Sequence, residues 1–262
     1  MADVPEIDPQ IEAMWREVLT TGHRSRWAAI PSSPRCTGCH KPFGGIGGVL
    51  TGLLGTRPSR KNPNWCNYCD DMMPRGGAEI DIALLFADVR GSTGLGEHLG
   101  ASAFAALLNR FYKTATDVLL THDAMIDKMV GDEVMAIFYP GVCGPGYRSI
   151  AVHTAEEMLR AMGFGRKGEP WLPLGVGVHA GPAFMGKIGT EGVHDFTALG
   201  DTVNTASRLQ ALAEAGEVVL SEEVYGSVSG EYPNLEQRTL TLRGREEPVA
   251  VRVLRVGTLT HA

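Results

Sequence analysis

Two aspartates lie where a run of apolar residues gives way to turn-forming residues. Asp88 comes after Ala83–Phe86 and shortly before Gly91-Ser92-Thr93, and Asp132 lies in a Gly-Asp turn between two further apolar runs. A carboxylate at the end of a buried strand sits at the rim of its sheet, where α/β proteins hold phosphate and its metal ion. Asp88 taken alone could also be a helix-capping residue. As a pair, the two acids suit Mg²⁺ or Mn²⁺, which complete their coordination shells with phosphate oxygens.

Asn204 and Arg208 are four residues apart in a segment with helical periodicity, so they share one helix face. The asparagine offers an uncharged hydrogen bond, and the arginine offers a planar fork that matches phosphoryl oxygens. By spacing alone these are ordinary surface residues. They become candidates for substrate binding only in combination with the two acids.

Four of the five cysteines form two CxxC pairs separated by 26 residues, namely Cys36 with Cys39 and Cys66 with Cys69. Two such turns can complete a tetrahedral shell of thiolates, and a loop-rich segment with little core of its own would gain folding energy from a metal. Structural zinc is the preferred interpretation, with an iron–sulfur cluster or a redox-active dithiol as alternatives. The CTGCH pattern at 36–40 also fits haem attachment, but this leaves the second pair unexplained.

Composition excludes several classes of function. The chain has 262 residues, 44% of them hydrophobic and 21% charged, with a formal net charge of −6, which disfavours a general nucleic-acid-binding surface. No apolar run approaches the ~20 residues that span a bilayer, so no membrane partner is expected. The acidic N-terminus lacks the features of a secretory signal, and the expected location is therefore cytoplasmic.

Three regions are expected along the chain. Residues 1–30 contain an amphipathic helix that starts at Asp8-Pro9, residues 31–76 form the Cys-rich probable zinc segment, and residues 77–262 form the catalytic domain. The Gly-rich run at 44–55 lacks the Lys-Ser/Thr of a phosphate loop and is interpreted as flexible packing.

The catalytic region predicts an α/β (α+β) fold of the ferredoxin-like βαββαβ plan, with helices on one face and additional C-terminal strands. The expected elements are a strand ending at Asp88, a long helix from 104, a hairpin at 125–138, a helix at 147–162, a strand at 174–179, a second hairpin at 183–199, a helix at 202–213 and mostly strand over 217–254.

Three separated motifs, FADVRGST at 86–93, KMVGDEVMAIF at 128–138 and DFTALGDTVNTASRL at 195–209, together resemble the class III nucleotidyl cyclases over residues 80–254. The resemblance implies that Asp88 and Asp132 bind two Mg²⁺ or Mn²⁺ ions, with the Val89 carbonyl as a further ligand. It also implies that Asn204 orients the ribose and that Arg208 stabilises charge on the α-phosphate.

The same resemblance implies that Lys128 and Thr197 contact the purine base. It also implies, through a looser alignment, that Arg245 binds the triphosphate. A lysine ammonium only donates hydrogen bonds, so it suits adenine N1 and opposes the N1–H of guanine. Guanylyl cyclases of this family typically have Glu and Cys at these two positions. The expected substrate is therefore ATP.

The implied reaction is attack of the ATP 3′-hydroxyl on the α-phosphate, which gives 3′,5′-cyclic AMP and pyrophosphate. The family forms its sites between two catalytic domains, and all the implied positions occur on this one chain, so the resemblance predicts a homodimer. The hairpin at 184–196 resembles the arm that crosses this interface. The alternatives are a guanylate cyclase or a catalytically silent nucleotide-binding or zinc-scaffold module. A diguanylate cyclase is disfavoured, because Val130 stands where a second glycine belongs.

Overall fold

Strand β1 (Gly76–Val89) is the centre of the architecture. The structure, a computed structural model, describes residues 8–22, 27, 30, 34–60, 62–72, 74–190, 193–241 and 248–257. The other strands in this part of the chain are β2 (Met125–Val130), β3 (Glu133–Phe138), β4 (Leu174–Thr190), β5 (Val193–Leu199), β6 (Glu217–Ser221), β7 (Glu236–Leu240) and β8 (Val249–Arg255). The helices are α1 (Pro9–Thr21), α2 (Gly45–Leu53), α3 (Asn67–Met72), α4 (Ser92–Leu99), α5 (Ala101–Thr121), α6 (Pro140–Cys143), α7 (Tyr147–Ala161), α8 (Asp201–Ala211) and α9 (Glu222–Tyr225).

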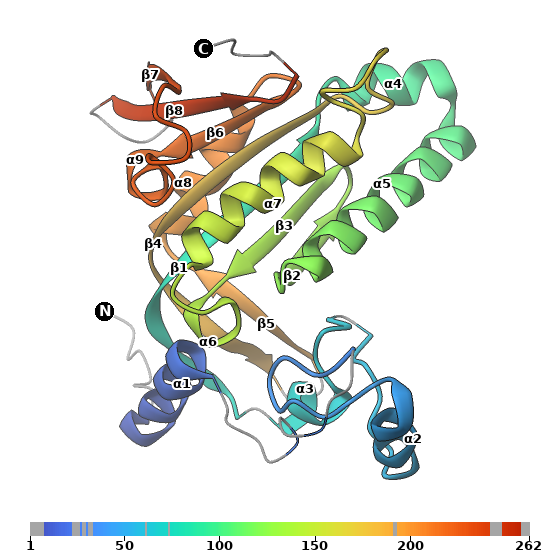
Figure 1. Ribbon diagram of the computed structural model, residues 1–262, viewed down its shortest axis with the longest axis vertical. Helices are drawn as coiled ribbons and strands as arrows, with labels where there is room; N and C mark the ends of the chain where they lie inside the picture. The colour runs from blue at the N-terminus through green and yellow to red at the C-terminus, as the bar shows by residue number, and fades with distance from the viewer. Residues whose placement is uncertain are drawn as a thin grey trace.

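The strands form one sheet in the order β2-β3-β1-β4-β6-β8-β7, with β5 paired to β4. β1 runs antiparallel to both β3 and β4, and β4 runs parallel to β6. The order of elements along the chain confirms the expected ferredoxin-like plan with added C-terminal strands (Figure 1). A short helix, α4, precedes the long helix, and Gly100 separates the two.

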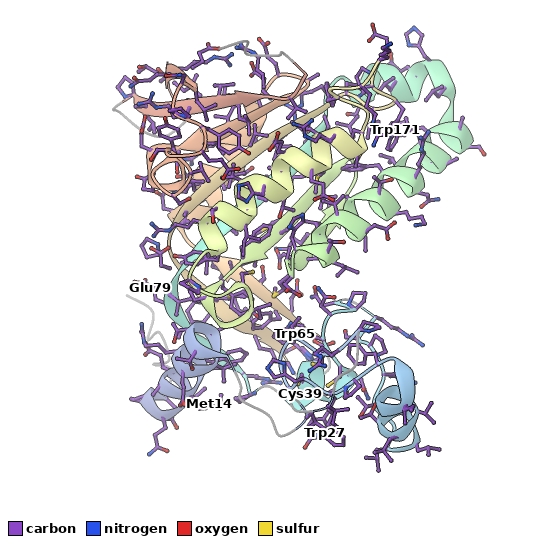
Figure 2. The ribbon with its side chains drawn as sticks, viewed as in Figure 1. Met14, Trp27, Cys39, Trp65, Glu79 and Trp171 are labelled. Atoms are coloured by element: carbon purple, nitrogen blue, oxygen red, sulfur yellow. The ribbon has the colours of Figure 1, made fainter. Side chains whose placement is uncertain are left out.

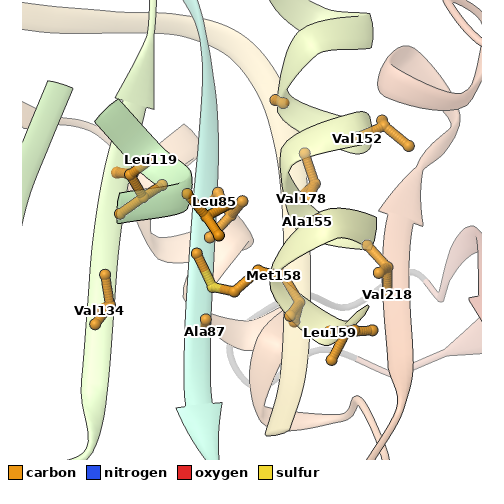
Figure 3. Packing of buried hydrophobic residues seen from close by; sticks show 14 of the residues in the cluster. Leu85, Ala87, Leu119, Val134, Val152, Ala155, Met158, Leu159, Val178 and Val218 are labelled. Atoms are coloured by element: carbon orange, nitrogen blue, oxygen red, sulfur yellow. The ribbon is translucent and has the colours of Figure 1, made fainter. Parts of the chain in front are cut away.

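Helices α5 and α7 cover the first face of the sheet (Figure 1). Alternate residues of β1 point to this face, and Leu85 and Ala87 pack there with Met158 and Leu159 of α7 (Figure 3). In both helices the apolar residues recur at helical spacing along one face, and the side chains of that face are buried. Burial of each large apolar side chain contributes about 1.5–3 kcal/mol, so this layer holds the sheet in shape.

The second face of the sheet is also covered. The other alternate residues of β1, including Leu84 and Phe86, pack with Trp15 of α1 and Ala206 of α8. The expectation of helices on one face therefore describes α5 and α7, whereas α1 and α8 lie opposite. Both are amphipathic, and the sheet is apolar on both sides, so each face needs a cover.

A long arm made of the end of β4 and β5 reaches across this second face. β4 is one continuous strand of 17 residues, where the sequence suggested a short strand and a separate hairpin. A Cβ atom on Gly186 would lie 2.2 Å from the carbonyl oxygen of Gly76, so glycine is needed where β1 and β4 approach most closely. The arm carries Phe196, whose ring lies 5.4 Å from that of Trp15 and 5.2 Å from that of Trp65.

The Cys-rich segment contains two helices, α2 and α3. The expectation of flexible packing at 44–55 was wrong, because Gly45–Leu53 is helical. Gly47 and Thr51 face inward, and the Thr51 hydroxyl donates to the Pro42 carbonyl at 2.6 Å. Inward-facing small residues let the helix lie close to its own loop. In the described part of the chain, no helix is long and apolar enough to cross a membrane.

Candidate active site and cysteine cluster

The two aspartates lie beside each other at one end of the sheet. Asp88 is the penultimate residue of β1, and Asp132 occupies the turn between β2 and β3. The Val89 N–H donates to the Asp132 carbonyl at 3.2 Å, and the Tyr112 hydroxyl holds the same turn by donating to Gly131 at 2.6 Å. The hairpin therefore delivers the second acid to the end of the first strand.

The charges of these acids are coupled. Burial raises the pKa of Asp88, the Arg90 guanidinium lowers it and the nearby Asp132 charge raises it, with a net increase. Burial and the charges of Asp88 and Asp132 also raise the pKa of Glu133, which pairs with Asp88 across β1 and β3. Glu133 is a third carboxylate at this rim that sequence reasoning did not single out as a site residue. A cluster whose negative charges oppose one another attracts a divalent cation.

Arg90 is a second residue that sequence reasoning missed. Its guanidinium donates to the Asp88 carboxylate, and the same side chain reaches the carbonyls of Ala211 and Ala213 at the end of α8, at 3.4 and 3.5 Å. It therefore ties the acid to α8. The signal available in the sequence was its position only two residues after Asp88.

Asn204 and Arg208 project from the free side of α8. Asn204 is exposed and Arg208 is half-buried, while Ala206 and Leu209 on the other side are buried. Within the described part of a single chain, neither side chain has a hydrogen-bond or ion-pair partner. A Cβ on Gly177 would lie 2.3 Å from the Gln210 nitrogen, so α8 rests directly on β4 and its orientation is fixed.

Lys128 and Thr197 meet although 69 residues separate them. The Lys128 ammonium donates to the Thr197 hydroxyl oxygen at 3.2 Å, and the Thr197 hydroxyl donates to the Asp127 carboxylate at 3.1 Å. Thr197 is buried, whereas about half of the Lys128 side chain is exposed. The arm β4–β5 makes this contact by carrying Thr197 across the sheet to β2.

The four cysteines form a compact cluster. Cys36 Sγ lies 3.8 Å from Cys69 Sγ, Cys39 Sγ lies 3.7 Å from Cys66 Sγ, and all four sulfurs lie within 4.8 Å of one another. A tetrahedral shell with metal–sulfur bonds of about 2.3 Å has sulfur–sulfur edges of about 3.8 Å, so the cluster has the size of a single-metal site. A polynuclear cluster places irons and sulfide between its thiolates and would separate some of these sulfurs further.

Backbone N–H groups surround the sulfurs. Cys39 N–H donates to Cys36 Sγ at 3.4 Å, and Cys69 N–H donates to Cys66 Sγ at 3.3 Å, so both CxxC turns repeat one geometry. Hydrogen bonds among the four sulfurs lower the pKa of Cys66 and lower that of Cys39 to about 7, whereas they raise the pKa of Cys36 and of Cys69. Cys39 and Cys66 are therefore the thiols that ionise most readily to the thiolate, which is the form that binds metal.

The segment that carries the cysteines packs against the arm and against β2. Trp65 contacts Phe196, and the Lys187 ammonium donates to the carbonyls of Asp70 and Asp71 at 3.3 and 3.2 Å. Cys39 and Trp65 lie at the same end of the molecule (Figure 2). Trp65, the chain neighbour of Cys66, and Phe196, the chain neighbour of Thr197, therefore link the cysteine cluster to the arm.

Two further sequence-derived candidates, Arg245 and Val89, and the fifth cysteine remain to be placed. Arg245 lies outside the described residues. Val89 is buried and its N–H donates to the Asp132 carbonyl, and the role of its own carbonyl as a metal ligand stays a prediction. Cys143 is separate from the cysteine cluster.

Comparison with known proteins identifies the domain. The family described as "Adenylate and Guanylate cyclase catalytic domain" matches residues 78–254. An adenylate cyclase of Anabaena cylindrica is 27% identical over 184 residues, which cover 65% of this chain and 36% of that protein. An uncharacterised protein of Mycobacterium tuberculosis is 31% identical over 66% of this chain and 31% of its own length. The chain thus spans about a third of the length of these curated relatives.

Solved structures of both substrate classes resemble the fold. The adenylyl cyclase CyaB from P. aeruginosa is 30% identical, with a TM-score of 0.57, and the match covers 67% of this chain and 94% of that one. The guanylyl cyclase Cya2 is 26% identical, with a TM-score of 0.61, and the match covers 71% and 98%. The family match covers more than half of the chain and includes every described candidate residue outside the cysteine cluster. The chain therefore belongs to the adenylate and guanylate cyclase family.

Proposed function

We propose that this protein is an adenylate cyclase that converts ATP to 3′,5′-cyclic AMP and pyrophosphate. Both adenylyl and guanylyl cyclases resemble the chain, so the choice of base depends on the residues that would contact it. The observation that carries the proposal is the contact between Lys128 and Thr197. This pair offers an ammonium donor for adenine N1 and a hydroxyl oxygen for the 6-amino group.

The roles of the remaining residues follow from their chemistry. Asp88 and Asp132, with the Val89 carbonyl, would hold Mg²⁺ or Mn²⁺, two ions per site, and Arg245 would bind the triphosphate. When bound, these ions polarise the α-phosphate and lower the pKa of the attacking 3′-hydroxyl. Asn204 orients the ribose, and Arg208 stabilises charge that develops on the α-phosphate. The coupled acids at the rim of the sheet support this assignment, because their mutual repulsion favours cation binding.

We further propose a homodimer with two equivalent sites. Support comes from Asn204 and Arg208, which have no partner in the described part of one chain and are therefore free to face a substrate held by another protomer. One protomer would supply Asp88 and Asp132, and the other would supply Lys128, Thr197, Asn204 and Arg208.

For the cysteine cluster we propose a structural zinc ion bound by Cys36, Cys39, Cys66 and Cys69. The sulfur–sulfur distances of 3.7 and 3.8 Å suit one tetrahedral metal and disfavour an iron–sulfur cluster. The proposed organisation is an N-terminal helix at 1–30, a zinc segment at 31–76 and a cyclase domain at 77–262, in a cytoplasmic enzyme.

The primary test is nucleotide turnover by purified protein with Mn²⁺ and either ATP or GTP. Cyclic AMP is the expected product, formed faster from ATP than cyclic GMP is from GTP. A preference for GTP would support the guanylate cyclase alternative. Absence of either product would support the silent binding module.

Exchange of the base-contacting pair is expected to reverse the substrate preference. In the double variant Lys128→Glu with Thr197→Cys, a carboxylate replaces the ammonium and accepts from guanine N1–H. The ratio of kcat/KM for ATP over GTP should fall by at least about 100-fold, because a mismatched polar site rejects its former substrate. Steady-state kinetics with both nucleotides measure this ratio, and an unchanged ATP preference contradicts the assignment of these two residues.

A further inference from the structure

A buried carboxylate lies beside the Lys128–Thr197 pair, and the reaction described above does not use it. The Asp127 side chain is 0% exposed. Its Oδ2 accepts from the Thr197 hydroxyl at 3.1 Å and lies 3.3 Å from the Lys128 ammonium. In the described part of the chain, its Oδ1 has no hydrogen-bond partner. The Asp127 carboxylate therefore interacts with the two residues that would contact the base.

A strand irregularity places Asp127 there. The pairing of β2 with β3 shifts register between Ile126 and Lys128, so Asp127 is the extra residue of a bulge. In a regular strand, neighbouring side chains point to opposite faces, whereas a bulge lets Asp127 and Lys128 both reach Thr197. The Ile126 N–H beside the bulge donates to Asn62 Oδ1 at 2.9 Å, so the Cys-rich segment holds the bulge in place.

The Thr197 hydroxyl has one proton to donate and two lone pairs that can accept. The single hydroxyl proton of Thr197 goes to the Asp127 carboxylate at 3.1 Å and not to the Ala198 carbonyl at 3.5 Å, because the carboxylate is the closer acceptor and a charged one. One lone pair of the Thr197 oxygen accepts from Lys128. One lone pair then remains for the substrate. Thr197 can therefore accept from a substrate donor, but it has no proton left to donate to a substrate acceptor.

We propose that Asp127 is a positioning residue that sets the hydrogen-bonding polarity of the base pocket and thereby selects a 6-amino purine over a 6-oxo purine. The inference rests on the proposed function. With the hydroxyl proton held by Asp127, Thr197 accepts from the amino group of adenine and repels the O6 atom of a 6-oxo base. Without Asp127 the hydroxyl retains only the Ala198 carbonyl as an acceptor, at 3.5 Å, and can turn to donate to O6.

The test compares ATP with ITP, which carries O6 in place of the 6-amino group. Asp127→Leu removes the acceptor at similar size and should lower the ratio of kcat/KM for ATP over ITP by about tenfold, the value of one hydrogen bond. Asp127→Asn retains an oxygen acceptor and should keep most of the ratio. In a Thr197→Val background, Asp127→Leu should leave the ratio unchanged, because the hydroxyl is gone.

General damage to the fold lowers turnover of both nucleotides and leaves their ratio unchanged. Asp117→Leu, on the exposed side of α5, makes the same chemical change away from the pocket and should leave the ratio as it is in the wild type. If Asp127→Leu does not fold, Asp127→Ala replaces it, since alanine equally lacks an acceptor. If the wild type prefers ATP and Asp127→Leu has the same ratio of kcat/KM for ATP over ITP, this inference is overturned and the proposed function is not. A wild-type protein that forms no cyclic nucleotide overturns the proposed function, and this inference with it.

A second observation, independent of the first, concerns an apolar surface on α2. Five large apolar side chains of this helix and its end are exposed to between 53 and 93%: Ile46, Val49, Leu50, Leu53 and Leu54. The first four follow helical i, i+3, i+4, i+7 spacing, so they form one stripe. Figure 1 shows α2 at the edge of the molecule, away from the sheet. A stripe of this kind that faces water indicates a contact surface.

The part of the sequence that contains the stripe is basic, and this charge identifies the partner of the stripe. Residues 18–69 contain seven lysines and arginines and no aspartate or glutamate, although the whole chain has a net charge of −6. Arg57 and Arg60 follow α2 and are exposed. A two-fold contact between copies through this face would bring its cations together, which is unfavourable. We infer that α2 lies on an anionic lipid surface, with its stripe among the acyl chains and with Arg57 and Arg60 at the headgroups.

Vesicle sedimentation tests this inference. The full chain should bind vesicles that contain phosphatidylglycerol and not vesicles of phosphatidylcholine alone, and salt should weaken the binding. Ile46→Ser with Leu53→Ser should weaken it by at least about tenfold, since two large apolar side chains no longer enter the lipid. Leu99→Ser, at an exposed leucine on α4, is the matched control.

Two outcomes overturn the lipid assignment. In one, the wild type does not bind anionic vesicles, or the double serine variant binds them as well as the wild type does. In the other, light scattering finds a dimer that the double serine variant converts to a monomer, which makes the stripe a contact between copies. A peripheral contact of this kind needs no membrane-spanning helix.

Discussion

A mixture of two inactive variants is expected to regain cyclase activity. Arg208→Ala removes the cation proposed to stabilise the α-phosphate, and Asp88→Ala removes a metal ligand, so each variant alone should lose turnover by about 10³-fold or more. In a mixed dimer, one site takes Asp88 from the first variant and Arg208 from the second, and it is therefore intact. Random exchange of subunits should restore about a quarter of wild-type activity, because half of the dimers are mixed and each has one good site.

A matched mixture provides the control. In this control the Arg208→Ala variant is mixed with an Asn204→Ala variant. Both substitutions lie on the same face of α8, so each site of the mixed dimer still lacks one of the two residues. This mixture should stay inactive. Recovery in the control, or no recovery with Asp88→Ala although light scattering detects mixed dimers, contradicts a site shared between protomers. The measurement is cyclic AMP formation after co-incubation, with mixed dimers isolated by two affinity tags.

Loss of one cluster cysteine is expected to remove the metal and unfold the segment around it. Zinc contributes about 10–16 kcal/mol to the folding of small cysteine-rich domains, and the segment has few other sources of stability. In Cys66→Ser the metal content should fall from one ion per chain to less than about a tenth. The loop at 34–60 should become sensitive to protease. Metal analysis and limited proteolysis measure these effects, and a visible absorption spectrum separates zinc, which is colourless, from iron and sulfide.

Cys143→Ser is the matched control for this change, because Cys143 lies outside the cluster, where its thiol donates to the Asp123 carbonyl at 3.7 Å. We also expect Cys66→Ser to reduce cyclase turnover, since Asn62 and Trp65 would no longer support Ile126 and Phe196, the neighbours of the base-contacting pair. If metal content, dimer formation and turnover all match those of the control, the cluster has no structural role.

Much of the fold could be predicted from patterns of apolar residues. The run before Asp88 indicated a buried strand, and the structure places these residues between two apolar layers. The Gly131-Asp132 turn indicated the hairpin of β2 and β3. The packing of α1 and α8 on the second face of the sheet was not predictable. Amphipathic spacing identifies the buried side of α8, but it does not identify the face of the sheet against which that side packs.

The helix α2 illustrates another limit. The run at 44–55 was interpreted as flexible packing because it lacks the Lys-Ser/Thr of a phosphate loop, and its six glycines also reduce helix propensity. In the structure, tertiary contacts of Thr51 with Pro42 outweigh this preference. The continuous strand β4 was missed for a related reason, since its glycines resemble turn residues until their close approach to β1 is known.

By itself the sequence determined the candidate chemistry: two acids at a strand rim, a polar pair at helical spacing and two CxxC turns, because spacing along the chain fixes local geometry. The tertiary structure decided which distant groups meet. The contact of Lys128 with Thr197, the carboxylate of Asp127 beneath them and the convergence of four sulfurs each join segments that are far apart in the sequence. Such contacts depend on how the sheet bends and how the arm crosses it, and these properties arise from the packing of the whole chain.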